Sequence, residues 1–224
     1  MDRLNRITLL LGKNAISKLK KSTVMVVGCG AVGSFAIESL ARSGVGHLVL
    51  IDFDKVEESN INRQLFALDS TVGKNKVDVA KQRIIDINPM IKVDVFNMFF
   101  DETTKLNIKP DFVIDAIDTV QSKIALYKWC FDNDVPFISS MGAARKTDLT
   151  KIKIDKISKT SVCPLASKIR KTVRDLKMKD FPVVYSTESA TPQQNGGREF
   201  GSMVTVTGTF GLMLSDFVIK KLIS

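Results

Sequence analysis

The sequence predicts an α/β protein built on a doubly wound, mostly parallel sheet with a basic C-terminal elaboration. The first observation is the order of its segments. Up to about residue 141, short apolar runs of strand length alternate with longer segments whose apolar residues recur at helical spacing. The second is a glycine-rich turn, G-C-G-A-V-G, between the first apolar run and the next helical segment. The third is composition, because 224 residues with 44% hydrophobic and 25% charged side chains suffice for one large core.

Two short helical segments, at residues 2–11 and 14–21, come first, and Gly12 separates them. In the alternating part we expect strands at residues 24–27, 47–51, 91–96, 111–115 and 137–141, and helices at about 33–43, 74–88 and 120–133. A further short helix is expected at residues 103–107. Because strands and helices alternate, the strands should run parallel and share one carboxyl edge, where ligands bind in such sheets.

The pattern changes near residue 145. We expect an exposed strand at residues 151–155, a basic helix at 164–178 and a brief strand at 183–184. Residues 186–201 are rich in Gly, Pro and Ser and are expected to form a mobile loop before a closing helix at 202–222. Residues 1–145 should therefore carry the ligand site, and residues 146–224 should elaborate the same domain.

The glycine-rich turn has the pattern of a nucleotide-binding loop. Gly28 would permit the tight turn, Gly30 the approach of a phosphate to the backbone, and Gly33 the packing of helix on strand. The N-terminus of the next helix offers unpaired N–H groups to an anion. Asp52 stands 19 residues after Gly33, at the end of the second strand, where its carboxylate would accept hydrogen bonds from ribose hydroxyls.

Polar residues gather where the expected strands end, and they include Asn60, Asn62, Arg63, Gln64, Lys76, Asp115 and Asp118. Arg63 and Lys76 are two cations beside a phosphate loop and would neutralise a triphosphate. Lys76 begins a helix, where a cation is unfavourable, so it should have an anionic partner. Asp118 would hold Mg²⁺ through its oxygens. This set suits nucleotide-dependent activation of a carboxylate.

The charge and the cysteines of the chain indicate which partners and which cellular compartment to expect. The formal net charge is +9, and residues 151–181 hold ten Lys and Arg against three Asp. Such a segment suits a polyanion such as RNA, or else a solvated lysine-rich face. The three cysteines show no paired spacing, so neither a disulfide framework nor a cysteine zinc site is expected. The N-terminus does not resemble a signal peptide, so we expect a cytoplasmic protein without a membrane partner.

Five motifs in combination resemble the adenylation domain shared by ubiquitin-activating enzymes and the molybdopterin-synthase and thiamine-synthesis adenylyltransferases: G-C-G-A-V-G-S, L-I-D-F-D, S-N-I-N-R-Q, V-G-K-N-K and D-A-I-D. The resemblance covers roughly residues 1–145 and implies a Rossmann-like fold with ATP and Mg²⁺ as cofactors. It implies that Asp52 holds the ribose and that Asp118 serves Mg²⁺ and adenylation. The implied contacts to the rest of ATP come from Gly28, Gly30, Ala31, Gly33, Asp54, Asn60, Arg63, Gln64 and Lys76.

Two positions need a comment within this resemblance. Ala31 stands where many members have a further glycine, and an ordinary φ would make that tolerable. Arg6, in L-N-R-I, is similar to the family arginine that reaches into the site of a partner subunit. The resemblance therefore implies a homodimer with composite sites, in which Arg6 joins Arg63, Lys76 and Asp118 as a catalytic residue.

The second part of the chain resembles one branch of these enzymes. K-T-S-V-C-P-L-A-S-K-I-R, V-Y-S-T-E and M-V-T-V-T-G-T-F-G are similar to the tRNA threonylcarbamoyladenosine dehydratase family. This resemblance implies ATP-dependent cyclisation of N6-threonylcarbamoyladenosine at position 37, in the anticodon loop of tRNAs that read ANN codons, through an acyl adenylate. The ureido group of the substrate would be the nucleophile, so no essential cysteine is expected.

Two alternatives stay open. An adenylyltransferase for a ubiquitin-like sulfur-carrier protein would share the ATP site, although the paired C-x-x-C motifs common in that group are missing. Cys163 lies where some relatives carry a catalytic or sulfur-carrying cysteine, so a sulfur-transfer protein is also open as a partner. The glycine motif with Asp52 would equally suit an NAD-binding oxidoreductase, but the lone histidine, His47, begins a strand away from the ligand edge.

Overall fold

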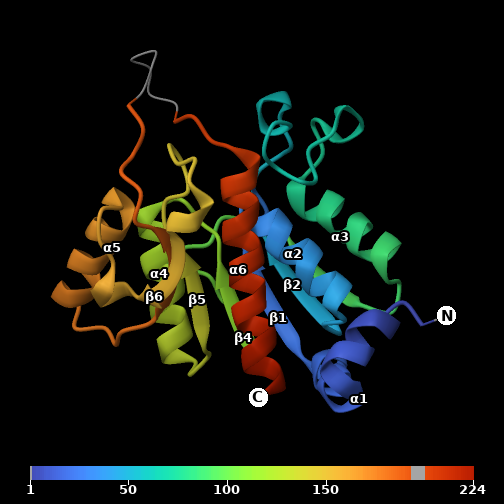
Figure 1. Cartoon of the computed structure of the whole chain (residues 1–224). Coiled ribbons are helices and arrows are strands. Elements are labelled where there is room, and N and C mark those ends of the chain that lie inside the picture. Colours follow the sequence, from blue (N-terminus) through green and yellow to red (C-terminus); the bar gives the residue numbers. More distant parts are fainter. Residues whose placement is uncertain (1, 193–199) are drawn as a thin grey trace.

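The computed structural model describes residues 2–192 and 200–224. Its centre is a seven-stranded sheet in the order β3-β2-β1-β4-β5-β7-β6 (Figure 1). The strands are β1 (Thr23–Val27), β2 (His47–Ile51), β3 (Lys92–Phe96), β4 (Phe112–Asp115), β5 (Phe137–Ser140), β6 (Ile152–Lys156) and β7 (Pro182–Ser186). Neighbouring strands pair in parallel except β6, which runs antiparallel to β7 at one edge. The doubly wound, mostly parallel sheet is thus confirmed.

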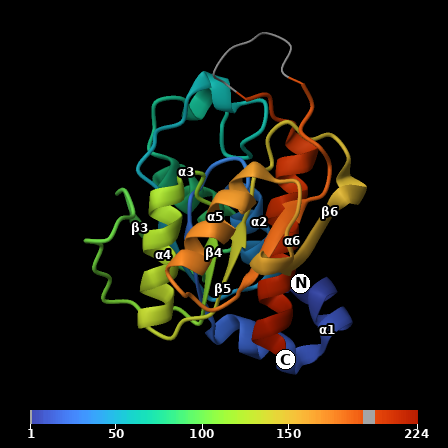
Figure 2. The ribbon, with the colours of Figure 1, turned by 90° about the vertical axis from the view of Figure 1, so that its left-hand side faces the viewer.

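Helices cover both faces of the sheet, as the two views in Figures 1 and 2 show. Alternate residues of β1 explain the two layers: Val24 and Val26 join one hydrophobic core, and Met25 and Val27 join the other. The first core is completed by α1 (Asn5–Lys21), α2 (Gly33–Ser43), α3 (Lys76–Ile87) and α6 (Val204–Ile223). The second core is completed by α4 (Val120–Asp132) and α5 (Pro164–Asp175).

Near the ends of the chain, the structure confirms one prediction and corrects another. Gly12 adopts φ 84° and ψ 159° and kinks α1, so the predicted interruption is correct. Strand β7 is longer than the predicted 183–184, because it pairs with β5 on one side and β6 on the other. Of the loop predicted at 186–201, residues 193–199 lie outside the described residues. At its start, Thr187 donates its backbone N–H to the carbonyl of Lys151 at 3.0 Å.

The short helix predicted at residues 103–107 is wrong, since this segment is irregular apart from a turn at residues 102–103. The Asp101 side chain accepts a hydrogen bond from the backbone N–H of Thr103 at 2.8 Å. The Thr104 hydroxyl in turn accepts one from the backbone N–H of Asp101 at 3.0 Å. Aspartate and threonine side chains that bond to nearby backbone in this way compete with helix formation, which explains the difference.

Helix α6 lies unusually close to α2, and two glycines make this contact. A Cβ added to Gly211 would lie 2.3 Å from the carbonyl oxygen of Val32 and 2.8 Å from Cβ of Phe35. One added to Gly208 would lie 3.3 Å from the Phe35 ring. Farther along, the hydroxyl of Ser215 donates to that of Ser39 on α2 at 2.8 Å. The two glycines therefore allow α6 to pack closely against α2.

We expect Gly211→Ala to lower the free energy of unfolding by about 1–3 kcal/mol, because the added methyl meets backbone atoms of α2 that cannot rotate away. Urea denaturation would measure the change. Gly201→Ala is the matched control, since nothing lies within 4 Å of a Cβ added there. Equal stability of the two variants would contradict the packing described.

Candidate functional site

A cleft of about 920 Å³ opens at the carboxyl edge of the sheet. Val27, Ile51, Ala116 and Ser140 line it, so it lies over the ends of β1, β2, β4 and β5. This edge includes the switch point between β1 and β4, from which the strand order runs in opposite directions. The cleft is lined by these predicted ligand residues: Gly28, Gly30, Ala31, Asp52, Asp54, Asn60, Arg63, Gln64, Lys76 and Asp118.

The glycine turn between β1 and α2 packs backbone against backbone. Gly28 has φ 96°, and a Cβ added to it would lie 2.6 Å from the carbonyl oxygen of Ala116. A Cβ on Gly33 would lie 1.7 Å from the carbonyl oxygen of Gly28, so a side chain there would separate helix from strand. At Gly30 the nearest atom would be Nε2 of Gln64, at 3.7 Å. Gly28 and Gly33 therefore serve packing, whereas Gly30 leaves backbone open to the cleft.

Asp52 is tied to this turn through its own carboxylate. One oxygen, Oδ2, accepts a hydrogen bond from the backbone N–H of Cys29 at 2.6 Å, and Oδ1 accepts one from the backbone N–H of Asp54 at 2.8 Å. Burial raises the pKa of the Asp52 carboxyl above its usual range, and the two N–H donors and Lys76 oppose that rise. Each carboxylate oxygen keeps a second lone pair, which suits it to accept a hydroxyl donor as well.

Lys76 has the anionic partner that its position predicted. It is the first residue of α3, and its side chain is 8% exposed. Its ammonium donates to Oδ2 of Asp54 at 2.7 Å. The Asp54 carboxylate compensates the unfavourable placement of a cation at a helix N-terminus. Lys76 is thereby held in place at the wall of the cleft.

Arg63 and Asn60 lie in a compact turn that begins with the 3₁₀ helix η1 (Glu58–Asn60). The Asn60 side chain is buried and accepts a hydrogen bond from the backbone N–H of Glu57 at 3.2 Å. The Arg63 guanidinium donates to the carbonyl oxygen of Ser59 at 2.7 Å and to Oδ1 of Asn62 at 2.8 Å. These bonds come from Nη1 alone, so the guanidinium is anchored on one side while the residue lines the cleft.

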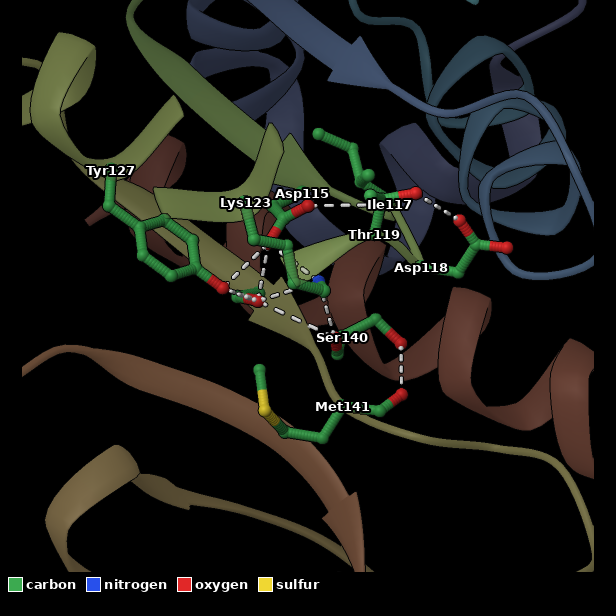
Figure 3. A network of polar contacts seen from close by, with 9 residues as sticks. Asp115, Ile117, Asp118, Thr119, Lys123, Tyr127, Ser140 and Met141 are labelled. Carbon is green, nitrogen blue, oxygen red and sulfur yellow. Dashed lines mark hydrogen bonds and ion pairs between the residues drawn. The ribbon is translucent and has the colours of Figure 1, made fainter. Parts of the chain in front are cut away.

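Asp118 lies in the loop that joins β4 to α4, and its side chain is exposed at the cleft (Figure 3). The Thr119 hydroxyl donates to Oδ1 of Asp118 at 3.1 Å. The loop begins with a turn in which Oδ1 of Asp115 accepts the backbone N–H of Ile117 at 3.0 Å. An exposed carboxylate on a fixed turn is suited to bind a cation or to face a reacting group.

Sequence reasoning missed part of the opposite wall, which follows β5. Arg145 and Lys146 line the cleft there, and so does Lys168 of α5. Arg145 has φ 60°, and its side chain donates to the carbonyl oxygen of Thr191 at 2.7 Å. The buried Lys146 donates to the carbonyl oxygen of Glu188. The sequence does contain a signal for Arg145 and Lys146, since A-A-R-K closely follows the end of a predicted strand.

Ser122 is a further missed residue. It is buried in the first turn of α4 and lines the cleft. Within residues 2–192 and 200–224, its hydroxyl is the buried side-chain polar atom without a hydrogen-bond partner. A buried hydroxyl that bonds to nothing in the protein is suited to a ligand or a water molecule.

Two predicted residues lie elsewhere. Gly33 is packed beneath the turn, as described above, and Arg6 is exposed on α1, outside the cleft of its own chain.

Cys163 is buried in the cleft wall, with its side chain close to Gly142. His47 donates to or accepts from Asp94 at 2.8 Å, where β2 begins, so it does not reach the cleft.

The comparisons with known proteins agree with this geometry. The model of the ThiF family matches residues 3–224. A tRNA threonylcarbamoyladenosine dehydratase of Bacillus subtilis is 49% identical over 193 residues, which cover 84% of this chain and 76% of that protein. The Escherichia coli protein of the same name is 34% identical over 248 residues, which cover 96% of this chain and 91% of that protein.

A solved structure extends this likeness to the fold. The crystal structure of Escherichia coli tRNA N6-threonylcarbamoyladenosine dehydratase in complex with ATP matches with a TM-score of 0.91 at 35% identity. The match covers 98% of this chain and 93% of that chain. The chain therefore belongs to the ThiF family, and within it groups with the tRNA threonylcarbamoyladenosine dehydratases.

Proposed function

We propose that this protein uses ATP to dehydrate N6-threonylcarbamoyladenosine in tRNA, closing the threonylcarbamoyl group into a ring. The observation that carries the proposal is the single cleft into which the glycine turn, Asp52, Lys76, Arg63 and Asp118 all face. Support also comes from the near full-length match to a dehydratase that was crystallised with ATP. The domain then consists of an ATP-binding part, residues 1–145, and an elaboration, residues 146–224, that supplies the second wall.

In this proposal the nucleotide occupies the half of the cleft nearest β1 and β2. The ribose hydroxyls donate to Asp52, whose carboxylate is already held by the backbone of Cys29 and Asp54. The phosphates approach the open backbone of Gly30 and the N-terminus of α2. Arg63 and Lys76 then balance their charge in a site that is organised before the ligand arrives.

The reaction needs two steps. A carboxylate oxygen of the threonyl group attacks the α-phosphorus of ATP, which forms an acyl adenylate and releases pyrophosphate. The ureido group then attacks the acyl carbon and loses a proton, and AMP leaves with one of the original carboxylate oxygens. The nucleoside has lost one water in total, and all the bond changes occur between substrate atoms.

Two of the three thiols, those of Cys29 and Cys130, are unsuited to act as nucleophiles. Burial, followed by the charge of Asp52, raises the pKa of the Cys29 thiol well above its usual range. Burial and the charge of Asp115 likewise raise the pKa of Cys130. Both thiols are neutral near pH 7, whereas a nucleophilic cysteine acts as the thiolate. An NAD-dependent reaction is disfavoured because His47 lies at the opposite edge of the sheet.

Magnesium fits the donor set at Asp118. The described residues contain no group of three or more His, Cys, Asp or Glu that could hold a metal ion by themselves. Mg²⁺ usually binds one or two carboxylates together with substrate phosphates and water, and the exposed Asp118 offers one such carboxylate at the cleft. Bound there, the ion would neutralise phosphate charge. Asp118 would hold it, and the Thr119 hydroxyl would orient that carboxylate.

The Asp118→Asn variant tests the reaction. We expect purified protein with ATP and Mg²⁺ to remove one water from N6-threonylcarbamoyladenosine in tRNA, as measured by mass spectrometry of nucleosides. Asp118→Asn should lower the rate by roughly 100-fold or more, because the transition state loses a charged group, while tRNA binding persists. If wild-type protein binds ATP but leaves the nucleoside unchanged, the proposed reaction is wrong.

Arg6 is proposed to complete the site of a second copy. It is exposed on α1 and lies outside its own cleft, so a catalytic role requires a homodimer with composite sites. Mixing the inactive variants Arg6→Ala and Asp118→Asn should then restore activity, since one site of each mixed dimer has both residues intact. Random mixing in equal amounts would give about a quarter of wild-type activity. A mixture as inactive as its components would exclude a contribution of Arg6 to a partner.

The basic face of α5 is proposed as the tRNA-binding surface. Lys168 lines the cleft, and Lys171 follows one helical turn later. A second groove of about 600 Å³ runs along the same helix and is lined by Arg170, Lys171 and Arg174. The positive surface therefore leads away from the cleft, in the way that an extended polyanion with one reacting nucleotide would require.

We expect the double variant Lys171→Glu/Arg174→Glu to bind tRNA more weakly. The slope of log affinity against log salt should become smaller by about 2, because two phosphate contacts are lost. Lys20→Glu/Lys21→Glu is the control, since it makes the same charge change in the last turn of α1, beside the amino end of β1. Binding that weakens equally in both double variants would argue for a general charge effect and against this surface.

A further inference from the structure

A buried ionic network lies directly beneath the cleft and has no part in the proposed chemistry. Asp115 at the end of β4 and Lys123 of α4 are both fully buried, and their charged atoms lie 2.7 Å apart. The Lys123 ammonium also donates to the hydroxyl of Ser139 at 3.2 Å and to the carbonyl oxygen of Ser140 at 2.7 Å. All three N–H groups of the ammonium are therefore used inside the protein.

The Asp115 carboxylate is equally saturated. Its Oδ2 accepts hydrogen bonds from Lys123, from the Tyr127 hydroxyl at 2.9 Å and from the Ser139 hydroxyl at 2.6 Å. Its Oδ1 accepts the backbone N–H of Ile117 at 3.0 Å. Figure 3 shows Lys123 and Tyr127 reaching from α4 toward Asp115, with Ser140 on the other side of the ammonium.

The network joins two segments that line the cleft. Through Asp115 it holds the turn that carries Asp118, and through Ser140 it holds the start of the segment that leads to Arg145 and Lys146. Residues 116–120 and 140–146 all line the cleft, whereas Asp115, Lys123 and Tyr127 do not. A ligand in the cleft would thus meet the loops, Ser140 included, but not Asp115, Lys123 or Tyr127.

Fold stability alone gives little reason for such a pair. Removing a carboxylate and an ammonium from water costs about as much as their attraction returns, and apolar residues of the same volume often serve as well. A network in which each group contacts several others does, however, restrict the positions of the groups it joins, since moving one of them breaks several hydrogen bonds.

We propose that Lys123 is a positioning residue, which fixes the Asp118 turn and the Ser140 carbonyl relative to each other so that Asp118 faces the reacting carboxylate. This inference rests on the proposed function for its kinetic part and on the network itself for its structural part. A displacement of about 1 Å in a reacting group can lower a rate by roughly 100-fold, so small shifts of the two loops are enough.

The test uses variants that separate position from stability. Lys123→Met leaves the Asp115 carboxylate buried without its counter-ion, so it should lower Tm by roughly 10 °C. Lys123→Met/Asp115→Asn removes both charges, and Asn can still accept from Ile117 and bond to the two hydroxyls, so Tm should return close to that of wild type. Lys128→Met is the matched control on the same helix, because Lys128 forms a surface pair with Glu102.

In the double variant we expect faster hydrogen exchange in residues 116–120 and 140–146, with unchanged exchange in the glycine turn at 28–34. Its kcat should fall roughly 10- to 100-fold while the Kd for ATP stays within about 2-fold of wild type. A purely structural role would restore kcat together with Tm. Wild-type exchange and wild-type kcat in the double variant would overturn the proposal.

The two proposals fail in different ways. If wild-type protein forms no dehydrated nucleoside, the proposed function is wrong, and the exchange rates of the two loops still decide whether Lys123 positions them. If wild-type protein is active and the double variant exchanges and reacts normally, the function stands and the positioning role is wrong.

Discussion

The close contact of backbone with backbone at the glycine turn is the constraint on which the rest of the site depends. A Cβ on Gly33 would lie 1.7 Å from the Gly28 carbonyl oxygen, so α2 approaches β1 as closely as the backbone allows. This approach lets the N–H of Cys29 reach the carboxylate of Asp52 on the neighbouring strand. It also sets the place of α2, against which Gly211 brings α6. The turn, the place of the Asp52 carboxylate and the closing helix therefore follow from one contact.

The charges around the cleft are arranged so that the protein holds them stably before a nucleotide arrives. Lys76 is nearly buried and would be costly as a lone cation, and its ammonium lies 2.7 Å from the carboxylate of Asp54. Asp54 itself remains 45% exposed, so this pair is accessible at the cleft. Asp52 is the corresponding case for a negative charge. Burial raises the pKa of its carboxyl, and hydrogen bonds from two backbone N–H groups oppose that rise. An entering nucleotide then meets oriented groups, which is what electrostatic preorganisation requires.

How much of the structure the sequence predicts depends on how far apart in the chain the interacting residues lie. The strand and helix periods, the packing roles of Gly28 and Gly33 and the anionic partner of Lys76 follow from local rules and are confirmed. The segment at residues 103–107 fails because side chains of Asp101 and Thr104 replace the helical bonds. The fully buried Lys123 could not be found, since a lysine in a helical pattern is usually exposed. Its burial depends on Ser139 and Ser140, which pairing of β5 with β4 brings close.

Different strands of the sheet end in different kinds of group, which explains how one edge can serve both a nucleotide and a macromolecule. Strands β1 and β2 end in groups that suit a ribose and phosphates, whereas β5 leads into Arg145, Lys146 and the basic helix α5. Asp118 follows β4, the strand that lies between these two halves. Because β4 pairs with β1 on one side and β5 on the other, a group at its end is held relative to both. A carboxylate that must meet ATP on one side and a tRNA nucleotide on the other would react at this strand, and the buried Asp115–Lys123 pair lies directly beneath that position.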